Sequence, residues 1–200
     1  MNVEYPIYRI SVLIVMTAVI ATTAGRLPER LATAASQDED SSRSDSDNTV
    51  TTEKTDTKSL IQEAFKGTKS AKTVAEFQSA IQTCGRLLEQ DLSESNRNYI
   101  KRLKAWNHNK RGELYAEQAT EAAEQEDADE AKELDEQALA EFNAAIDLDD
   151  TRWKSYHNRG VSLALFGKYD EALRDFDKTI EMKPQYANAW FNRAEIAYES

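Results

Sequence analysis

Several residue types with special chemistry are scarce in this chain of 200 residues, which has one cysteine, two histidines, three prolines and six glycines. One cysteine excludes an internal disulfide, and with His108 and His157 it makes too small a set for a zinc site. The glycines stand singly, so the sequence has no glycine-rich phosphate loop, and it has no nucleophile elbow or paired-histidine metal motif. We therefore expect no catalytic residues, no metal ligands and no cofactor: the chain is predicted not to be an enzyme.

The scarcity of glycine and proline, with many alanine, leucine, glutamate and lysine residues, favours helix over strand. Val74, Phe77, Ile81, Cys84 and Leu88 recur at gaps of three and four, which is the spacing of one helix face. We therefore predict an all-α protein. Cys84 is expected to be a buried, inert thiol, with an intermolecular disulfide as the alternative.

The N-terminal segment is predicted to be an export signal. Ile10 to Gly25 carries no charge, follows Arg9 and ends in small residues that suit a signal peptidase. Sixteen helical residues span roughly 24 Å, against roughly 30 Å for a hydrocarbon core. Residues 1–35 are therefore a signal peptide or, alternatively, an N-terminal membrane anchor. Either alternative places the rest of the chain outside the cytoplasm, in the periplasm or another extracytoplasmic space.

Residues 36–58 form a polar, acidic stretch with one valine as its only sizeable apolar side chain. Such a stretch buries too little surface to offset the entropy of ordering, so we predict a disordered linker. The folded part, a helical domain over residues 59–200, is expected to begin with helices in residues 59–104.

An internal repeat dominates the C-terminal part. Similar residues recur in this part at one constant spacing, which we call the repeat period. The aligned pairs are Tyr156 with Trp190, Asn158 with Asn192, Arg159 with Arg193, Gly160 with Ala194, and Leu163 with Ala197. A fixed period of this size indicates stacked helical hairpins. We predict helices near 151–166, 169–182 and from 186 onward. Gly167 is expected to end the first of them in a left-handed conformation, and Pro184 to stop the second.

The residues over 153–186 resemble the tetratricopeptide repeat family. The pattern of this family requires a large and a small residue in the first helix, a small and an aromatic residue in the second, and a proline at the end. In this chain these positions hold Tyr156, Gly160, Ala172, Phe176 and Pro184. One departure is Thr179, where the family usually has alanine. The resemblance continues into the first helix of an incomplete repeat over 187–200. It implies antiparallel hairpins stacked as a right-handed solenoid.

Residues 105–150 form a divergent repeat with a lengthened hairpin. Ala138, Phe142 and Ala145 precede Ala172, Phe176 and Thr179 by one repeat period. Gly112, however, precedes Gly160 by one period and a further fourteen residues. The additional fourteen residues correspond to about two helical turns in each arm, which keeps the apolar faces in phase. We predict a hairpin that projects by roughly 10 Å, with its turn near Glu126 to Asp129.

Charge is distributed unevenly along the same region. Residues 59–112 carry ten basic and five acidic residues, whereas residues 113–150 carry one basic and fifteen acidic residues. The acidic, coiled-coil-like hairpin is interpreted as a solvated face, with binding of a basic partner or a cation as the alternative. A basic stripe at helical spacing is expected to face the acidic helices that follow, and it comprises Arg97, Lys101, Lys104, His108 and Arg111. The acid excess disfavours binding of nucleic acid.

The remaining function class is binding. In the tetratricopeptide family the concave face is lined mostly by the first helices of successive repeats. This resemblance assigns a peptide-binding groove to Lys154, His157, Asn158, Val161, Phe191, Asn192 and Glu195. We predict an exported interaction scaffold for a peptide or protein partner.

The alternative is a regulatory or docking region of an enzyme whose catalytic domain lies beyond residue 200. The face formed by Trp190, Ala194 and Ala197 has no covering helix in the sequence, so we expect the natural chain to continue.

Overall fold

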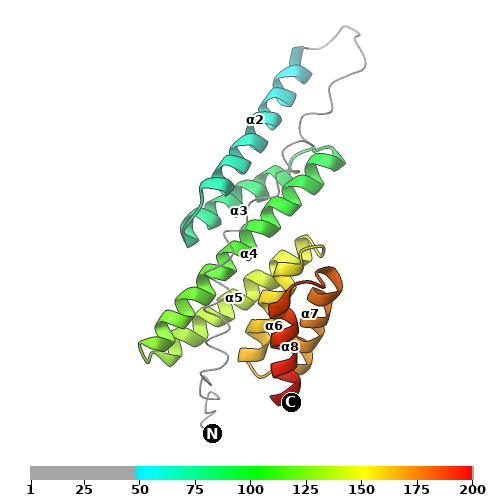
Figure 1. The fold of residues 1–200 in the computed structure, drawn as a ribbon. Helices are drawn as coiled ribbons and strands as arrows, with labels where there is room; N and C mark the ends of the chain where they lie inside the picture. Colours follow the sequence, from blue (N-terminus) through cyan, green and yellow to red (C-terminus); the bar gives the residue numbers. More distant parts are fainter. Residues whose placement is uncertain (1–47, 200) are drawn as a thin grey trace. The chain divides into compact units, whose positions relative to one another are not determined.

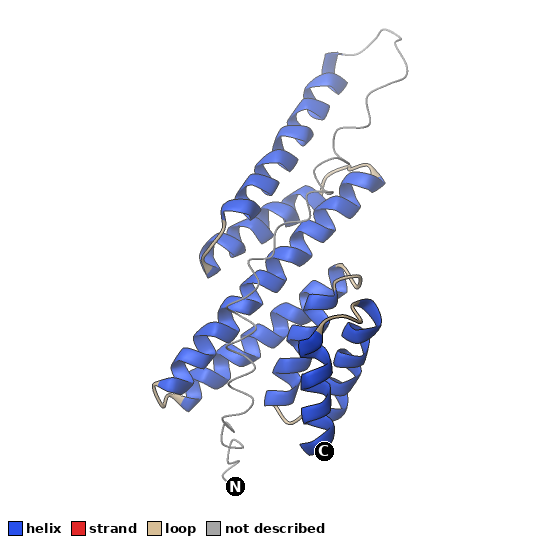
Figure 2. Cartoon of the chain, viewed as in Figure 1, coloured by secondary structure: helices blue, strands red, loops and turns tan. Residues whose placement is uncertain are grey.

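The computed structural model describes residues 48–199, and all of its regular elements in this range are helices (Figures 1 and 2). The helices are α2 (Asn48–Ser70), α3 (Val74–Leu88), α4 (Glu94–Glu124), α5 (Ala128–Leu148), α6 (Trp153–Leu165), α7 (Tyr169–Met182) and α8 (Ala187–Glu199). The predicted all-α class is confirmed for these residues. The predicted signal or anchor segment and residues 36–47 of the predicted linker lie outside the described residues.

Residues 48–58 differ from the prediction, because they form the first part of α2 instead of a disordered linker. Their polar composition excludes a core but does not exclude a solvated helix. Each residue that extends an existing helix adds a backbone hydrogen bond without a new nucleation step. None of the described helices is both long and apolar enough to cross a membrane.

The chain divides into two compact units, and the boundary falls inside α4, between His108 and Asn109. In the first unit the described residues are 48–108. Its core contains Cys84, which is fully buried, with Leu87, Ile100 and Leu103. Burial raises the pKa of the Cys84 thiol to about 12, so the thiol stays protonated and unreactive. The predicted burial of Cys84 is confirmed.

Helix α3 begins with a capping box. The Thr73 hydroxyl accepts a hydrogen bond from the Glu76 amide, and the Glu76 carboxylate accepts one from the Thr73 amide. The predicted apolar stripe lies on the buried face of this helix, although Leu87 is buried more deeply than Leu88. At the other end, Arg97 of α4 donates to the carbonyl groups of Leu88 and Gln90, at 2.9 and 3.1 Å.

In the second unit the described residues, 109–199, form successive helical hairpins. Helix α7 has the predicted bounds, and α6 and α8 agree with the prediction within about two residues. Gly167, with φ +68°, ends α6 in the left-handed region as expected. The amide of Lys168 then donates to the Leu163 carbonyl at 2.9 Å. Helix α7 packs against both α6 and α8, and α5 packs against α6.

A phenylalanine lies over a glycine in both complete hairpins. A Cβ atom placed on Gly112 would lie 2.6 Å from Phe142 Cε1, and one placed on Gly160 would lie 2.9 Å from Phe176 Cε1. Both distances are too short for real atoms, so only glycine permits these crossings. Thr179, the departure from the family pattern, is fully buried, and its hydroxyl donates to the Asp175 carbonyl at 2.8 Å.

The lengthened hairpin of α4 and α5 is helical in both arms, as predicted. Its turn is formed by Gln125, Glu126 and Asp127, slightly earlier than predicted, and Glu126 has φ +63°. Asp127 caps α5 by accepting the Glu130 amide at 3.0 Å. The residues buried in this hairpin are mostly small, and they include Ala116, Ala119, Ala122, Ala131 and Ala138.

The predicted pairing of the basic stripe with the acidic helices is found at Arg111. Arg111 of α4 donates to Glu141 of α5 at 2.5 Å, and both side chains are largely buried. Arg97 instead binds backbone carbonyl groups, and Lys101 is exposed. The stripe therefore contributes to folding through different partners at its two ends.

Candidate protein-binding face

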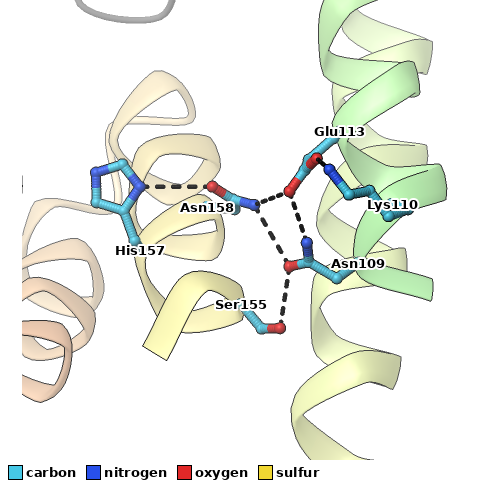
Figure 3. A network of polar contacts seen from close by, with 6 residues as sticks. All are labelled: Asn109, Lys110, Glu113, Ser155, His157 and Asn158. Carbon is cyan, nitrogen blue, oxygen red and sulfur yellow. Dashed lines mark hydrogen bonds and ion pairs between the residues drawn. The ribbon is translucent and has the colours of Figure 1, made fainter. Parts of the chain in front are cut away.

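A polar network joins α4 to α6 within the second unit (Figure 3). Asn109 of α4 is at its centre and is almost completely buried. Its Oδ1 accepts from Ser155 Oγ at 3.0 Å and from Asn158 Nδ2 at 3.4 Å, and its Nδ2 donates to Glu113 Oε1 at 2.7 Å. The side chain of Asn109 therefore uses both its acceptor and its donor inside the protein.

Glu113 is the single carboxylate among the six residues drawn in Figure 3. It accepts from Lys110 Nζ at 2.6 Å and from Asn158 Nδ2 at 3.3 Å, in addition to Asn109. Burial lowers the pKa of both Arg152 and Lys154, and the charge of Glu113 opposes that shift in each case. Glu113 is therefore near three cationic side chains: those of Lys110, Arg152 and Lys154.

His157 extends the network from α6 to α8. Its ring is 1% exposed and lies against Tyr186 and Phe176, with centroids 5.0 and 5.9 Å away. Asn192 Nδ2 lies 3.2 Å from His157 Nε2, and His157 Nδ1 lies 3.4 Å from Asn158 Oδ1. Nε2 accepts a hydrogen bond from the Asn192 amide group, so the proton of the neutral ring is assigned to Nδ1, which donates to Asn158 Oδ1. Burial lowers the pKa of His157 to about 4.

The seven residues predicted to line a groove are not equally accessible. Lys154, Asn158, Val161 and Glu195 are half-buried, and Phe191 is 56% exposed. His157 and Asn192, by contrast, lie beneath the surface at 1% and 6% exposure. The repeat period places these two residues on first helices, which the family resemblance assigns to the concave face. Tyr186, which precedes α8, however packs against the His157 ring. They are therefore positioned to support the face from within, not to touch a partner.

Asn158 and Asn192 occupy equivalent positions in the repeat but differ in their contacts. The Asn158 amide bonds to Asn109, Glu113 and His157, so both of its N–H donors and one acceptor site of its oxygen are used within the chain. Asn192 Oδ1 is buried without a hydrogen-bond partner among the described residues. Val161 packs against the apolar clusters around Phe142 and Phe176, which makes it part of the core beneath the face.

The sequence analysis did not identify the contribution of α4 to this face. Asn109, Lys110 and Glu113 precede His157, Asn158 and Val161 by one constant offset. Gly112 precedes Gly160 by this same number of residues. Aligning α4 with α6 at that spacing could therefore have identified Asn109, Lys110 and Glu113 from the sequence. Glu113 in particular brings a carboxylate to a surface that also holds Lys110 and Lys154.

Comparison with known proteins gave partial similarities and no matching family model. Protein STIP1 homolog of Dictyostelium discoideum is 32% identical over 84 residues, 42% of this chain and 15% of that protein. Hsp70-Hsp90 organizing protein of Triticum aestivum is 38% identical over 55 residues, 28% of this chain and 10% of that protein. Tetratricopeptide repeat and J domain-containing co-chaperone DNJ1 of Cryptococcus neoformans is 30% identical over 59 residues, 30% of this chain and 11% of that protein.

The chain thus spans between about a tenth and a seventh of the length of these relatives. These similarities support a tetratricopeptide-like family for part of the chain, in agreement with the helical hairpins. They are consistent with protein partners and give no indication of nucleic acid.

His157 predicts a specific dependence of stability on pH. Its pKa in the folded chain, about 4, is below the ordinary value of 6.5, so between these values the unfolded chain binds more protons. The stabilisation is present above pH 6.5 and is lost as the pH falls. We expect the free energy of unfolding of the second unit to drop by about 2 kcal/mol from pH 7 to pH 5 because of this residue.

The measurement is urea unfolding at both pH values for the wild type, His157→Gln and His108→Gln. His157→Gln should lose most of the pH dependence, and His108→Gln, which removes the other histidine, should retain it. Equal pH dependence in all three proteins would contradict the assignment.

Proposed function

We propose that this chain is a non-catalytic interaction scaffold that binds an extended peptide or protein segment on the face formed by α4, α6 and α8. The observation that carries the proposal is the polar network of Asn109, Glu113 and Asn158, which fixes the first helices of neighbouring hairpins side by side. Such a rigid support holds nearby exposed side chains in a constant arrangement, which lowers the entropy lost on binding.

Four of the predicted residues are accessible enough to touch a partner: Lys154, Asn158, Phe191 and Glu195. The Lys154 ammonium group can donate to a backbone carbonyl or to a carboxylate of the partner. Phe191 offers an exposed aromatic ring of the kind that often contributes most to binding energy. His157 and Asn192 contribute indirectly, because they hold α6 and α8 together beneath these side chains.

The comparisons support a scaffold role at a coarse level, since the relatives include a protein named as an organizing protein and one named as a co-chaperone. The identity of the partner does not follow from those names. We propose a partner recognised by hydrogen bonding and by apolar contact, with no reaction catalysed by this chain.

A pull-down with the full chain tests this assignment. The Lys154→Ala, Phe191→Ala double variant removes one cation and one exposed ring from the face. We expect it to lose at least about 10-fold in affinity for the captured partner, because a few exposed anchors carry most of the binding energy. Both side chains are at least partly accessible, so helicity measured by circular dichroism should be unchanged.

The control is Lys168→Ala, Glu171→Ala, which truncates two exposed charged side chains at the start of α7, a helix that is not part of this face. It should retain the partner. Equal retention, or equal loss, in the two double variants would contradict recognition by the proposed face.

We also propose that the chain is exported, on the evidence of the uncharged run from Ile10 to Gly25 after Arg9. A reporter that is active only outside the cytoplasm, fused after Arg30, should be active. Replacement of Val15 and Ile20 by lysine should abolish its activity, because charges in the apolar run block insertion. Activity that is absent from the unmodified fusion would overturn the proposal.

A further inference from the structure

The carboxylate of Glu113 is enclosed by hydrogen-bond donors from two helices, α4 and α6 (Figure 3). Its Oε1 accepts from Asn109 Nδ2 at 2.7 Å and from Asn158 Nδ2 at 3.3 Å. Its Oε2 accepts from Lys110 Nζ at 2.6 Å. One ammonium group and two amide groups thus converge on a single anion. Charged and amide N–H donors of this kind are the groups with which proteins bind carboxylates.

The two amide groups are also held in place by contacts that do not involve Glu113. Asn109 is 1% exposed, and its Oδ1 accepts from Ser155 Oγ at 3.0 Å. Asn158 Oδ1 lies 3.4 Å from His157 Nδ1, which helps to fix the orientation of that amide. The two Nδ2 groups would therefore still point to the same place if the carboxylate were removed. Solvent reaches this place, because the side chain of Glu113 is 23% exposed.

Glu195 is the equivalent residue on α8, and it provides a comparison within the same chain. Glu195 lies one repeat period after Val161, which in turn aligns with Glu113. Glu195 is half-buried, but it forms no hydrogen bond or ion pair with another described residue. Phe191 and Asn192 stand there in place of the asparagine and the lysine of α4. A carboxylate at this position is therefore enclosed by donors on α4 and not on α8.

We propose that Glu113 determines which partners the face accepts, because its carboxylate occupies an anion-binding site that the chain itself forms. The site consists of Lys110 Nζ and the Nδ2 groups of Asn109 and Asn158. This inference rests on the proposed function and specifies the chemistry of the partner. A partner carboxylate at this position meets donors that are already used, and the charge of Glu113 repels it. The partner segment therefore presents neutral or basic groups here, and the Lys154 ammonium group receives a backbone carbonyl.

Acetate is the probe, because it has the carboxylate of an acidic side chain and little else. Glu113→Ala removes the internal carboxylate and opens the site. In nuclear magnetic resonance spectra of the isotope-labelled full chain, acetate should shift the side-chain amide signals of Asn109 and Asn158 in this variant and not in the wild type. About 0.1 M acetate should also raise the unfolding midpoint of Glu113→Ala by at least about 2 °C relative to chloride, because an ion that binds only the folded chain stabilises it.

Glu195→Ala is the matched control, since it removes a carboxylate at the equivalent position of α8, where the donors are absent. Acetate should change its unfolding midpoint no more than chloride at the same ionic strength does. Glu113→Gln covers the case in which Glu113→Ala does not fold, because it keeps the size of the side chain and an oxygen for the Asn109 amide. Without the negative charge, acetate can pair with Lys110, so the midpoint of this variant should also rise in acetate.

The inference is overturned if acetate acts as chloride does on Glu113→Ala or, where that variant does not fold, on Glu113→Gln. An equal effect of acetate on Glu195→Ala would also overturn it, as would equal shifts of the two amide signals in the wild type, because the site would then be open in the presence of Glu113. The titration uses no partner. Its failure is therefore distinguishable from failure of the proposed face, which the pull-down with Lys154→Ala, Phe191→Ala reports.

Discussion

The close crossing of paired helices at a glycine is the constraint on which the second unit depends. Phe142 and Phe176 can be almost completely buried only because Gly112 and Gly160 have no side chain at the point where the rings lie. A first helix without that gap would be held further from its partner, and the buried ring would lose its closest contacts. The arginine that precedes each glycine forms an ion pair with the acidic residue that precedes each phenylalanine. Apolar packing and ion pairing therefore favour the same register between the two helices of a hairpin.

The polar network on the other side of α6 depends on this packing. Asn109, Ser155 and His157 are all buried, and each buried polar group must find a partner in a fixed position to offset its desolvation. Their hydrogen bonds form because α6 is held against α5 and α7 by the apolar clusters that include Phe142, Phe176 and Val161. The proposed binding face is thus the polar side of helices whose opposite side is fixed by phenylalanine and glycine.

Much of this fold could be predicted because its signals are local. Gly167 and Pro184 mark the ends of α6 and α7, and the fourteen additional residues indicated a hairpin lengthened in both arms. The helical state of residues 48–58 was missed because low hydrophobicity excludes a core but does not exclude a solvated extension of a packed helix. Burial of His157 was also missed, because it depends on Tyr186, whose packing is set by tertiary structure and not by the repeat. Burial of Asn192, which contacts the His157 ring from α8, was missed as well.

A double-mutant cycle between Gly160 and Phe176 tests the central constraint most directly. Trp106→Phe provides the background, since fluorescence then comes from Trp153 and Trp190, both in the second unit. Gly160→Ala should lower the free energy of unfolding by about 1–3 kcal/mol, although alanine is the better helix former. In Phe176→Leu, where the ring is absent, the same substitution should cost at least about 1 kcal/mol less. Additive effects of the two substitutions, within about 0.5 kcal/mol, would contradict the account.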